Sequence, residues 1–191
     1  MIYETIITSV NMQGQVHVAP FGVQYLGDKV KLSPFRPSTT LENILTTEHA
    51  VLNIVNDVRV FAGALTGRQA WQFVATSHEH QVRLSSALSH TLLILDEVHD
   101  DKVRPQLMMK KLNEQSHRLF QGFNRAQAAV IELAVLTSRL HILPREKIIN
   151  EIEYLQIAID KTASEVEQEA WGWLLEKINH FFVQQDGINL S

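Results

Sequence analysis

The spacing of hydrophobic positions changes near the middle of the chain. In the first part, β-branched and apolar residues come in short runs, and Gly14 and Gly27 stand in turn signals between the early runs. Short runs bounded by turn residues are typical of antiparallel strands in a β-sandwich or a barrel. The predicted strands cover residues 2–9, 15–24, 29–32, 50–56, 73–75, 81–88 and 91–98.

The second part of the chain has helical spacing instead. From Pro105 onward we predict no strand, and apolar residues recur every three or four positions. Pro144 stands where a first-turn proline belongs, and Ser164 with Glu167 has the spacing of a capping box. We therefore predict an α+β protein with a β-domain over residues 1–104 and a bundle of about three helices over residues 105–191.

One helix is predicted inside the β-domain, and its start carries the most informative chemistry. Thr39 and Glu42 fit a capping box just before a small apolar face. Free backbone N–H groups at a helix start bind anions, and Arg36 with the hydroxyls that follow it can add contacts to phosphate oxygens. The other interpretation is a capped helix after a proline turn, with Arg36 in solvent.

A second segment, Ala19-Pro20-Phe21-Gly22, lies on a predicted strand and combines small residues with a glycine. Such residues let a flat ligand approach the backbone closely. The same pattern also fits a bulge or a barrel corner.

Composition narrows the function classes. The 191 residues carry a formal net charge of -4 with no basic stripe, which argues against a nucleic-acid partner. The absence of cysteine excludes disulfides, Cys-ligated metals and thiol catalysis. We find no signal-peptide pattern and no membrane-spanning apolar run, so the expected location is the cytoplasm, with no membrane partner. His78-Glu79-His80 is better explained as a solvated loop than as metal ligands, and no metal is predicted.

Several short motifs, taken in order, resemble the FMN-binding split-barrel superfamily, which includes the flavin reductase-like proteins, and within it the DUF447 family. Each motif is weak alone, but their order is specific and spans nearly the whole chain. They are Tyr3-Glu4, Ala19-Pro20-Phe21-Gly22, Ser38-Thr39-Thr40 with Asn43, Asn53 to Asp57 with Phe61, Asn124-Arg125-Ala126, and Arg139-Leu140.

The resemblance implies a six-stranded antiparallel split barrel, a homodimer, and FMN near each subunit interface. A deazaflavin could replace FMN, since related barrels use one. The helical region would pack on the barrel or at the dimer interface. The implied phosphate contacts are Arg36, Ser38, Thr39, Thr40 and Asn43. The implied contacts to the ring or ribityl chain are Pro20, Phe21, Gly22 and Val23, with Asn53 and Asp57 at the polar edge of the ring.

Asn124 and Arg125 form the sharpest polar pair at the start of the helical region. Arg125 could meet phosphate or an acidic substrate, or the pair could be a helix N-cap with a solvated arginine. For the whole chain, the resemblance implies an oxidoreductase of flavin reductase-like type that takes a reduced nicotinamide and a small-molecule redox substrate. The alternatives are a non-catalytic flavin carrier or sensor and a ligand-free dimeric scaffold. No catalytic side chain is predicted.

Overall fold

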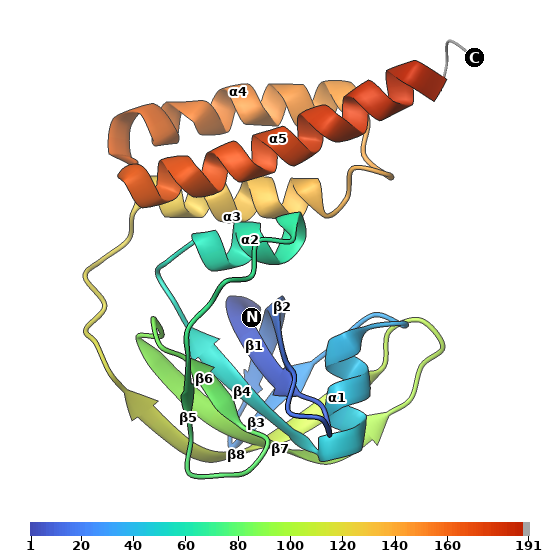
Figure 1. Cartoon of the computed structure of the whole chain (residues 1–191), viewed down its shortest axis with the longest axis vertical. Helices are drawn as coiled ribbons and strands as arrows, with labels where there is room; N and C mark the ends of the chain where they lie inside the picture. Colours follow the sequence, from blue (N-terminus) through green and yellow to red (C-terminus); the bar gives the residue numbers. More distant parts are fainter. Residues whose placement is uncertain (189–191) are drawn as a thin grey trace. The chain divides into compact units, whose positions relative to one another are not determined.

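The computed structural model describes residues 1–188 and divides the chain into two compact units (Figure 1). Unit 1 holds residues 1–56 and 70–120, and unit 2 holds residues 57–69 together with the chain from residue 121 onward. In chain order the elements are β1 (Tyr3–Val10), β2 (Val16–Leu26), β3 (Lys29–Leu32), α1 (Thr39–Thr47), β4 (His49–Ile54), α2 (Arg59–Thr66), β5 (Phe73–Ala75), β6 (Val82–Leu84), β7 (Ser89–His99), β8 (Gln106–Ser116), α3 (Arg125–Thr137), α4 (Arg145–Thr162) and α5 (Glu165–Ile188).

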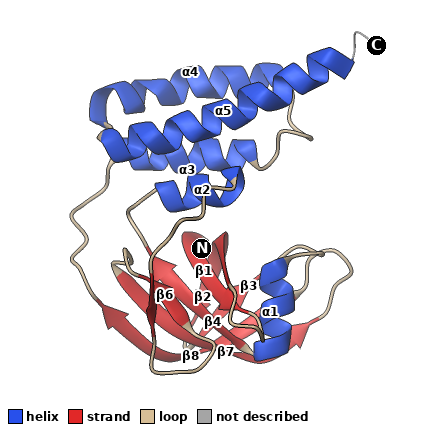
Figure 2. Cartoon of the chain, in the orientation of Figure 1, coloured by secondary structure: helices blue, strands red, loops and turns tan. Residues whose placement is uncertain are grey.

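Unit 1 is an antiparallel barrel, which confirms the predicted fold class (Figure 2). Its strands follow the closed order β1-β2-β3-β8-β7-β4. Ile7 of β1 lies opposite Ala19 of β2 on one side and Leu52 of β4 on the other. Because side chains alternate along a strand, this register sends one set of apolar residues into the barrel. That core is made by Ile7, Val23, Val30, Leu32, Leu41, Ile44, Ala50, Leu52, Leu93, Leu107 and Met109.

Helix α1 contributes Leu41 and Ile44 to this barrel core. The helix begins one residue earlier than the predicted cap: Ser38, not Thr39, is the N-cap, and its hydroxyl accepts a hydrogen bond from the Leu41 amide at 3.2 Å. Ser38 has the extended backbone that an N-cap needs. The start of α1 is therefore fixed against the strands by the burial of its own first turns.

The prediction that no strand follows Pro105 is wrong, because β8 pairs with β3 and with β7. The barrel therefore continues past the predicted boundary at residue 104. The β8 sequence is rich in Met, Lys, Gln and Glu, which favour helices in isolation. Pairing on both edges, and burial of Leu107 and Met109 in the core, override that preference.

The short hairpin of β5 and β6 packs on the outside of the barrel. Asn53 ties it there: its Oδ1 accepts from the Leu84 amide at 2.9 Å, while its Nδ2 donates to the Thr8 hydroxyl at 3.1 Å. Gln81 adds a second tie, since its Nε2 donates to the carbonyls of Ala50 and Leu93. The hairpin is thus held by buried side-chain bonds rather than by a hydrophobic core of its own.

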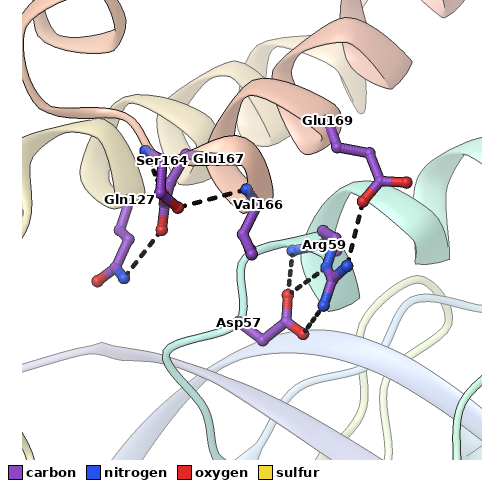
Figure 3. A network of polar contacts seen from close by, with 7 residues as sticks. All are labelled: Asp57, Arg59, Gln127, Ser164, Val166, Glu167 and Glu169. Atoms are coloured by element: carbon purple, nitrogen blue, oxygen red, sulfur yellow. Dashed lines mark hydrogen bonds and ion pairs between the residues drawn. The ribbon is translucent and has the colours of Figure 1, made fainter.

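Unit 2 contains α3, α4 and α5, as predicted, and also α2, whose segment the sequence pattern left ambiguous. The predicted capping box at the start of α5 is confirmed, because the Glu167 carboxylate accepts from both the amide and the hydroxyl of Ser164 (Figure 3). Within residues 1–188, no helix has the length and apolar character needed to cross a membrane.

Candidate functional site

A hollow of about 250 Å³ lies beside the start of α1. Its walls come from three stretches of unit 1: strand β2, the turn between β3 and α1, and the loop before β8. The lining residues are His17, Ala19, Pro20, Phe21, Gly22, Ser33, Pro34, Phe35, Ser38, Thr40 and Arg104. A neighbouring hollow of about 240 Å³ shares Gly22, Ser33 and Arg104 with it. Each hollow alone is smaller than the about 300–1,000 Å³ of most ligand pockets, and the two adjoin at the residues that they share.

The start of α1 offers hydrogen-bond donors to the first hollow. An α-helix leaves its first amide N–H groups without partners inside the helix, and the Ser38 hydroxyl satisfies only that of Leu41. The amides of Thr39 and Thr40 meet no acceptor among the residues that the structure describes. Thr40 is 2% exposed and lines the hollow. This helix start is therefore suited to an anion.

Arg104 lies at both parts of the double hollow, whereas Lys31 lines only the second, and neither cation was among the sequence-predicted residues. The Arg104 Nε donates to the Ser33 carbonyl at 3.0 Å, and its guanidinium lies 4.8 Å from the centre of the Phe35 ring. These contacts hold the side chain across the mouth of the site. The only signal in the sequence is the position of Arg104 just before Pro105, which gives no indication of a partner 71 residues away.

Arg36, the predicted phosphate contact, lies beside the site but is not among its lining residues. Its guanidinium binds the Asp100 carboxylate at 2.6 Å and the Asp101 carbonyl at 3.1 Å. Asp101 in turn accepts from the amides of Arg104 and Val103, and these hydrogen bonds lower the pKa of its carboxyl. Arg36 therefore braces the loop that carries Arg104.

The Ala19–Gly22 segment lines the first hollow as the sequence suggested, but Val23 does not. Val23 is fully buried in the barrel core. Gly22 sits where the two hollows meet, and a Cβ built there would lie 2.9 Å from the Cγ2 of Ile2. A side chain at this point would crowd Ile2 at the edge of both hollows.

Two predicted contacts, Asn43 and Asn53, have their side chains engaged inside unit 1. The Asn43 Nδ2 donates to the Ser9 hydroxyl at 3.0 Å, which ties α1 to β1. Asn53 is fully buried and bonded to β1 and β6, as described above. Neither residue lines the double hollow.

The remaining predicted residues, Asp57, Asn124 and Arg125, belong to unit 2. Asp57 pairs with Arg59, whose guanidinium also reaches Glu169 at 3.1 Å (Figure 3). The hydrogen bond to Asp57 is the main cause that raises the pKa of Arg59. Asn124 is the N-cap of α3 and accepts from the amides of Ala126 and Gln127. Arg125, at the first position of α3, is exposed.

The charge of the double hollow is positive at neutral pH. Burial lowers the pKa of His17, so this lining imidazole is neutral there, and Arg104 and Lys31 supply the charge. Over residues 1–188, no cluster of three His, Asp or Glu side chains is arranged to hold a metal ion. The arrangement can bind an anion at the helix start and an apolar or aromatic group against Phe21 and Phe35.

The family model described as the N-terminal domain of DUF447, a protein of unknown function, matches residues 3–118, and the DUF447 C-terminal model matches residues 124–176. No curated protein matches the chain.

Among solved structures, the FMN-bound protein MM1853 from Methanosarcina mazei is 20% identical, with a TM-score of 0.78 over 92% of this chain and 94% of that one. The 2-nitrobenzoate 2-nitroreductase NbaA of Pseudomonas fluorescens is 19% identical, with a TM-score of 0.53 over 60% of this chain and 64% of that one. Flavoredoxin from Methanosarcina acetivorans is 11% identical, with a TM-score of 0.53 over 63% of this chain and 73% of that one. These likenesses show that the chain has the fold of flavin reductase-like barrels.

Proposed function

The chain belongs to the DUF447 family, and from that premise we propose that it is a flavoprotein that binds FMN in the double hollow beside α1. The observation that carries the proposal is the meeting of three features in one place. A helix start, through Ser38 and Thr40, a guanidinium and an apolar wall all line the same space. The likeness to an FMN-bound member of the same family supports this choice of ligand.

The residues of the site fit the two chemical parts of FMN. A phosphate group carries close to two negative charges and accepts several hydrogen bonds. The Thr39 and Thr40 amides, the Thr40 hydroxyl and the Arg104 guanidinium are the donors that would hold it. Phe21 and Phe35, with the small Ala19 and Gly22, would accept the flat ring system.

We further propose that the protein is an oxidoreductase of flavin reductase-like type. Bound flavin supplies hydride and electron transfer, and the protein supplies binding, orientation and electrostatics. The positive charge of Arg104 and the neutral His17 would favour a reduced, anionic ring over a cationic one. A reduced nicotinamide is the proposed donor, and a small molecule is the proposed acceptor. The homodimer and the cytoplasmic location belong to the same proposal.

The first experiment is the visible spectrum of the purified protein, with FMN added if the protein is colourless. Anaerobic titration with NADH and NADPH follows. We expect bound FMN that bleaches with one of the two donors. Bound FMN that stays oxidised would overturn the reductase and leave a flavin carrier or sensor, and failure to bind FMN would overturn the flavoprotein itself. A deazaflavin tested in parallel identifies the preferred cofactor, and sedimentation identifies the oligomeric state.

A further inference from the structure

A second polar pocket lies on unit 1, away from the residues of the double hollow. It measures about 200 Å³ and lies between the β5–β6 hairpin and the outer face of β7 and β8. Its lining residues are Val74, Ala75, Thr76, Ser77, Arg83, His90, Leu92, Asn113, Gln115 and His117. No motif that suggested FMN binding contributes a residue to this pocket.

Two imidazoles meet in the pocket. The Nδ1 of His90 lies 2.8 Å from the Nε2 of His117. The rings are nearly parallel, at 8°, and their centroids are 5.0 Å apart. This separation is close to the largest that a 2.8 Å contact between ring nitrogens allows, so the bond runs along the line through both rings. Only one hydrogen can lie between the two facing nitrogens, so one ring donates its N–H and the other accepts it.

The charge around this pair is positive. Arg83 lines the pocket, and Arg118 follows His117 in the chain. Burial, and then the neighbouring cations, lower the pKa values of both His90 and His117. None of the described residues that line the pocket is acidic.

The other charged groups nearby lie outside the pocket. Glu114 of β8 accepts a hydrogen bond from Thr91, and both residues alternate to the opposite face of their strands from the pocket. In the turn between β5 and β6, His78 contacts the Ser77 hydroxyl, while Glu79 faces His80. The positive charge of Arg83 therefore has no carboxylate partner inside the pocket.

We propose that this pocket binds a small oxyanion, a phosphate or carboxylate group, between Arg83 and the His90–His117 pair. The Arg83 guanidinium uses one nitrogen on the Leu84 carbonyl at 3.0 Å, and its remaining N–H groups suit an oxyanion. The amides of Asn113 and Gln115 add donors. The volume is below that of a whole cofactor site and fits a small ion or the charged end of a larger molecule.

Binding is coupled to proton uptake. In the free pocket a proton on the pair is repelled by Arg83, but an oxyanion beside the pair compensates that repulsion and favours the charged form. By linkage, the same oxyanion binds more tightly as pH falls and the pair takes up one proton. The pocket is thus a proton-linked anion site that does not depend on flavin binding.

The test is NMR titration of the imidazole resonances in the full chain, with inorganic phosphate, acetate and chloride as separate probes. Calorimetry in two buffers of different ionisation enthalpy counts the protons taken up. We expect saturable binding of phosphate or acetate, with proton uptake and a rise in the pKa of the histidine pair. The probe that saturates distinguishes a phosphate site from a carboxylate site. No saturation with either one, or equal effects of chloride, would overturn the proposal.

Three variants make the test specific. Arg83→Gln should weaken oxyanion binding by about tenfold or more, because it removes a charge-assisted contact. Arg118→Gln removes an adjacent cation that does not line the pocket and serves as the matched control. His117→Ala, at an exposed position, removes one imidazole of the pair and should reduce proton uptake. Equal weakening by the two arginine variants would indicate only a diffuse positive field and would contradict the site.

Discussion

The two pockets of the barrel unit differ in how the chain assembles them. The hollow beside α1 is built mostly from two short continuous stretches, residues 17–22 and 33–40, with Arg104 as the one distant addition. The histidine pocket has one continuous stretch, residues 74–77, and takes its charged and imidazole groups singly from Arg83, from β7 and from beyond the end of β8. A site made of continuous stretches leaves a recognisable local pattern, whereas a site made by strand register leaves none.

Substitution of Asn53, which ties the β5–β6 hairpin to the barrel, should distinguish the two pockets most strongly. Asn53→Ala removes the acceptor of the Leu84 amide and the donor to Thr8, all inside the barrel unit. Leaving a buried group unsatisfied costs about 1–3 kcal/mol, so we expect a loss of that order in the free energy of unfolding, measured by urea denaturation. Oxyanion binding should weaken, because the hairpin carries Arg83.

FMN affinity of the folded Asn53→Ala protein should stay within about twofold, since the double hollow does not use this residue. Gln72→Ala, in the exposed segment before β5, is the matched control and should change neither quantity. If Asn53→Ala instead abolished FMN binding in the folded protein, Asn53 would be a ligand contact, as the sequence first suggested.

Arg104→Ala is expected to have the next largest effect. It removes the guanidinium that lines both hollows, and a charge-assisted hydrogen bond contributes about 1.5–3 kcal/mol, so FMN should bind about ten- to a hundredfold more weakly. Fluorescence titration measures this change. Lys102→Ala, in the same loop and in neither lining set, controls for the loss of a positive charge. Unchanged FMN affinity in the Arg104 variant would show that Arg104 does not contact the ligand.

Sequence patterns predicted the β1, β2, β3 and β4 strands, the α1 helix and the helical second region because each has its own local period or cap. They missed β8, whose residues favour a helix until β3 and β7 pair with it. They proposed Arg36, which stands two residues before Ser38 in the chain, and gave no signal for Arg104. Only the fold shows that Arg36 reaches the loop of Asp100 and Asp101 instead.

Within the candidate site, the pattern found the residues whose role depends on their neighbours in the chain. Ser38 and Thr40 at a helix start, and Pro20 to Gly22 on a strand, all line one hollow. It could not tell that Val23 and Asn43 turn to other partners, because alternation along β2 and the face of α1 decide that. Long-range register is the information that a single sequence does not carry.

Arg36→Ala should have a smaller effect than Arg104→Ala. Arg36 acts on the site only through the loop that it braces, and its ion pair with Asp100 is exposed, where such pairs contribute at most about 1 kcal/mol. We therefore expect FMN affinity to fall by less than about fivefold in the same titration. Asp100→Ala removes the other member of the same ion pair and should weaken FMN binding by a similar factor. A loss as large as that of Arg104→Ala would mean that Arg36 touches the phosphate directly.

The smallest expected effect is the pH dependence that the histidine pair gives to stability. Burial lowers the pKa values of His90 and His117 from 6.5 in the folded protein. Above pH 6.5 both states leave these imidazoles neutral, so the pair does not change stability there. As pH falls below 6.5 the unfolded chain takes up protons first, so the free energy of unfolding decreases until the folded pair is protonated as well.

Urea denaturation across this range measures the slope, and His90→Gln with His117→Ala should flatten it. His17→Gln is the matched comparison in the other pocket, since burial also lowers the pKa of His17. The His17→Gln variant should remove only the part of the slope that comes from His17. Phosphate at saturation should reduce the slope that comes from the pair. If phosphate left that slope unchanged, the histidine pocket would not be the proton-linked oxyanion site proposed for it.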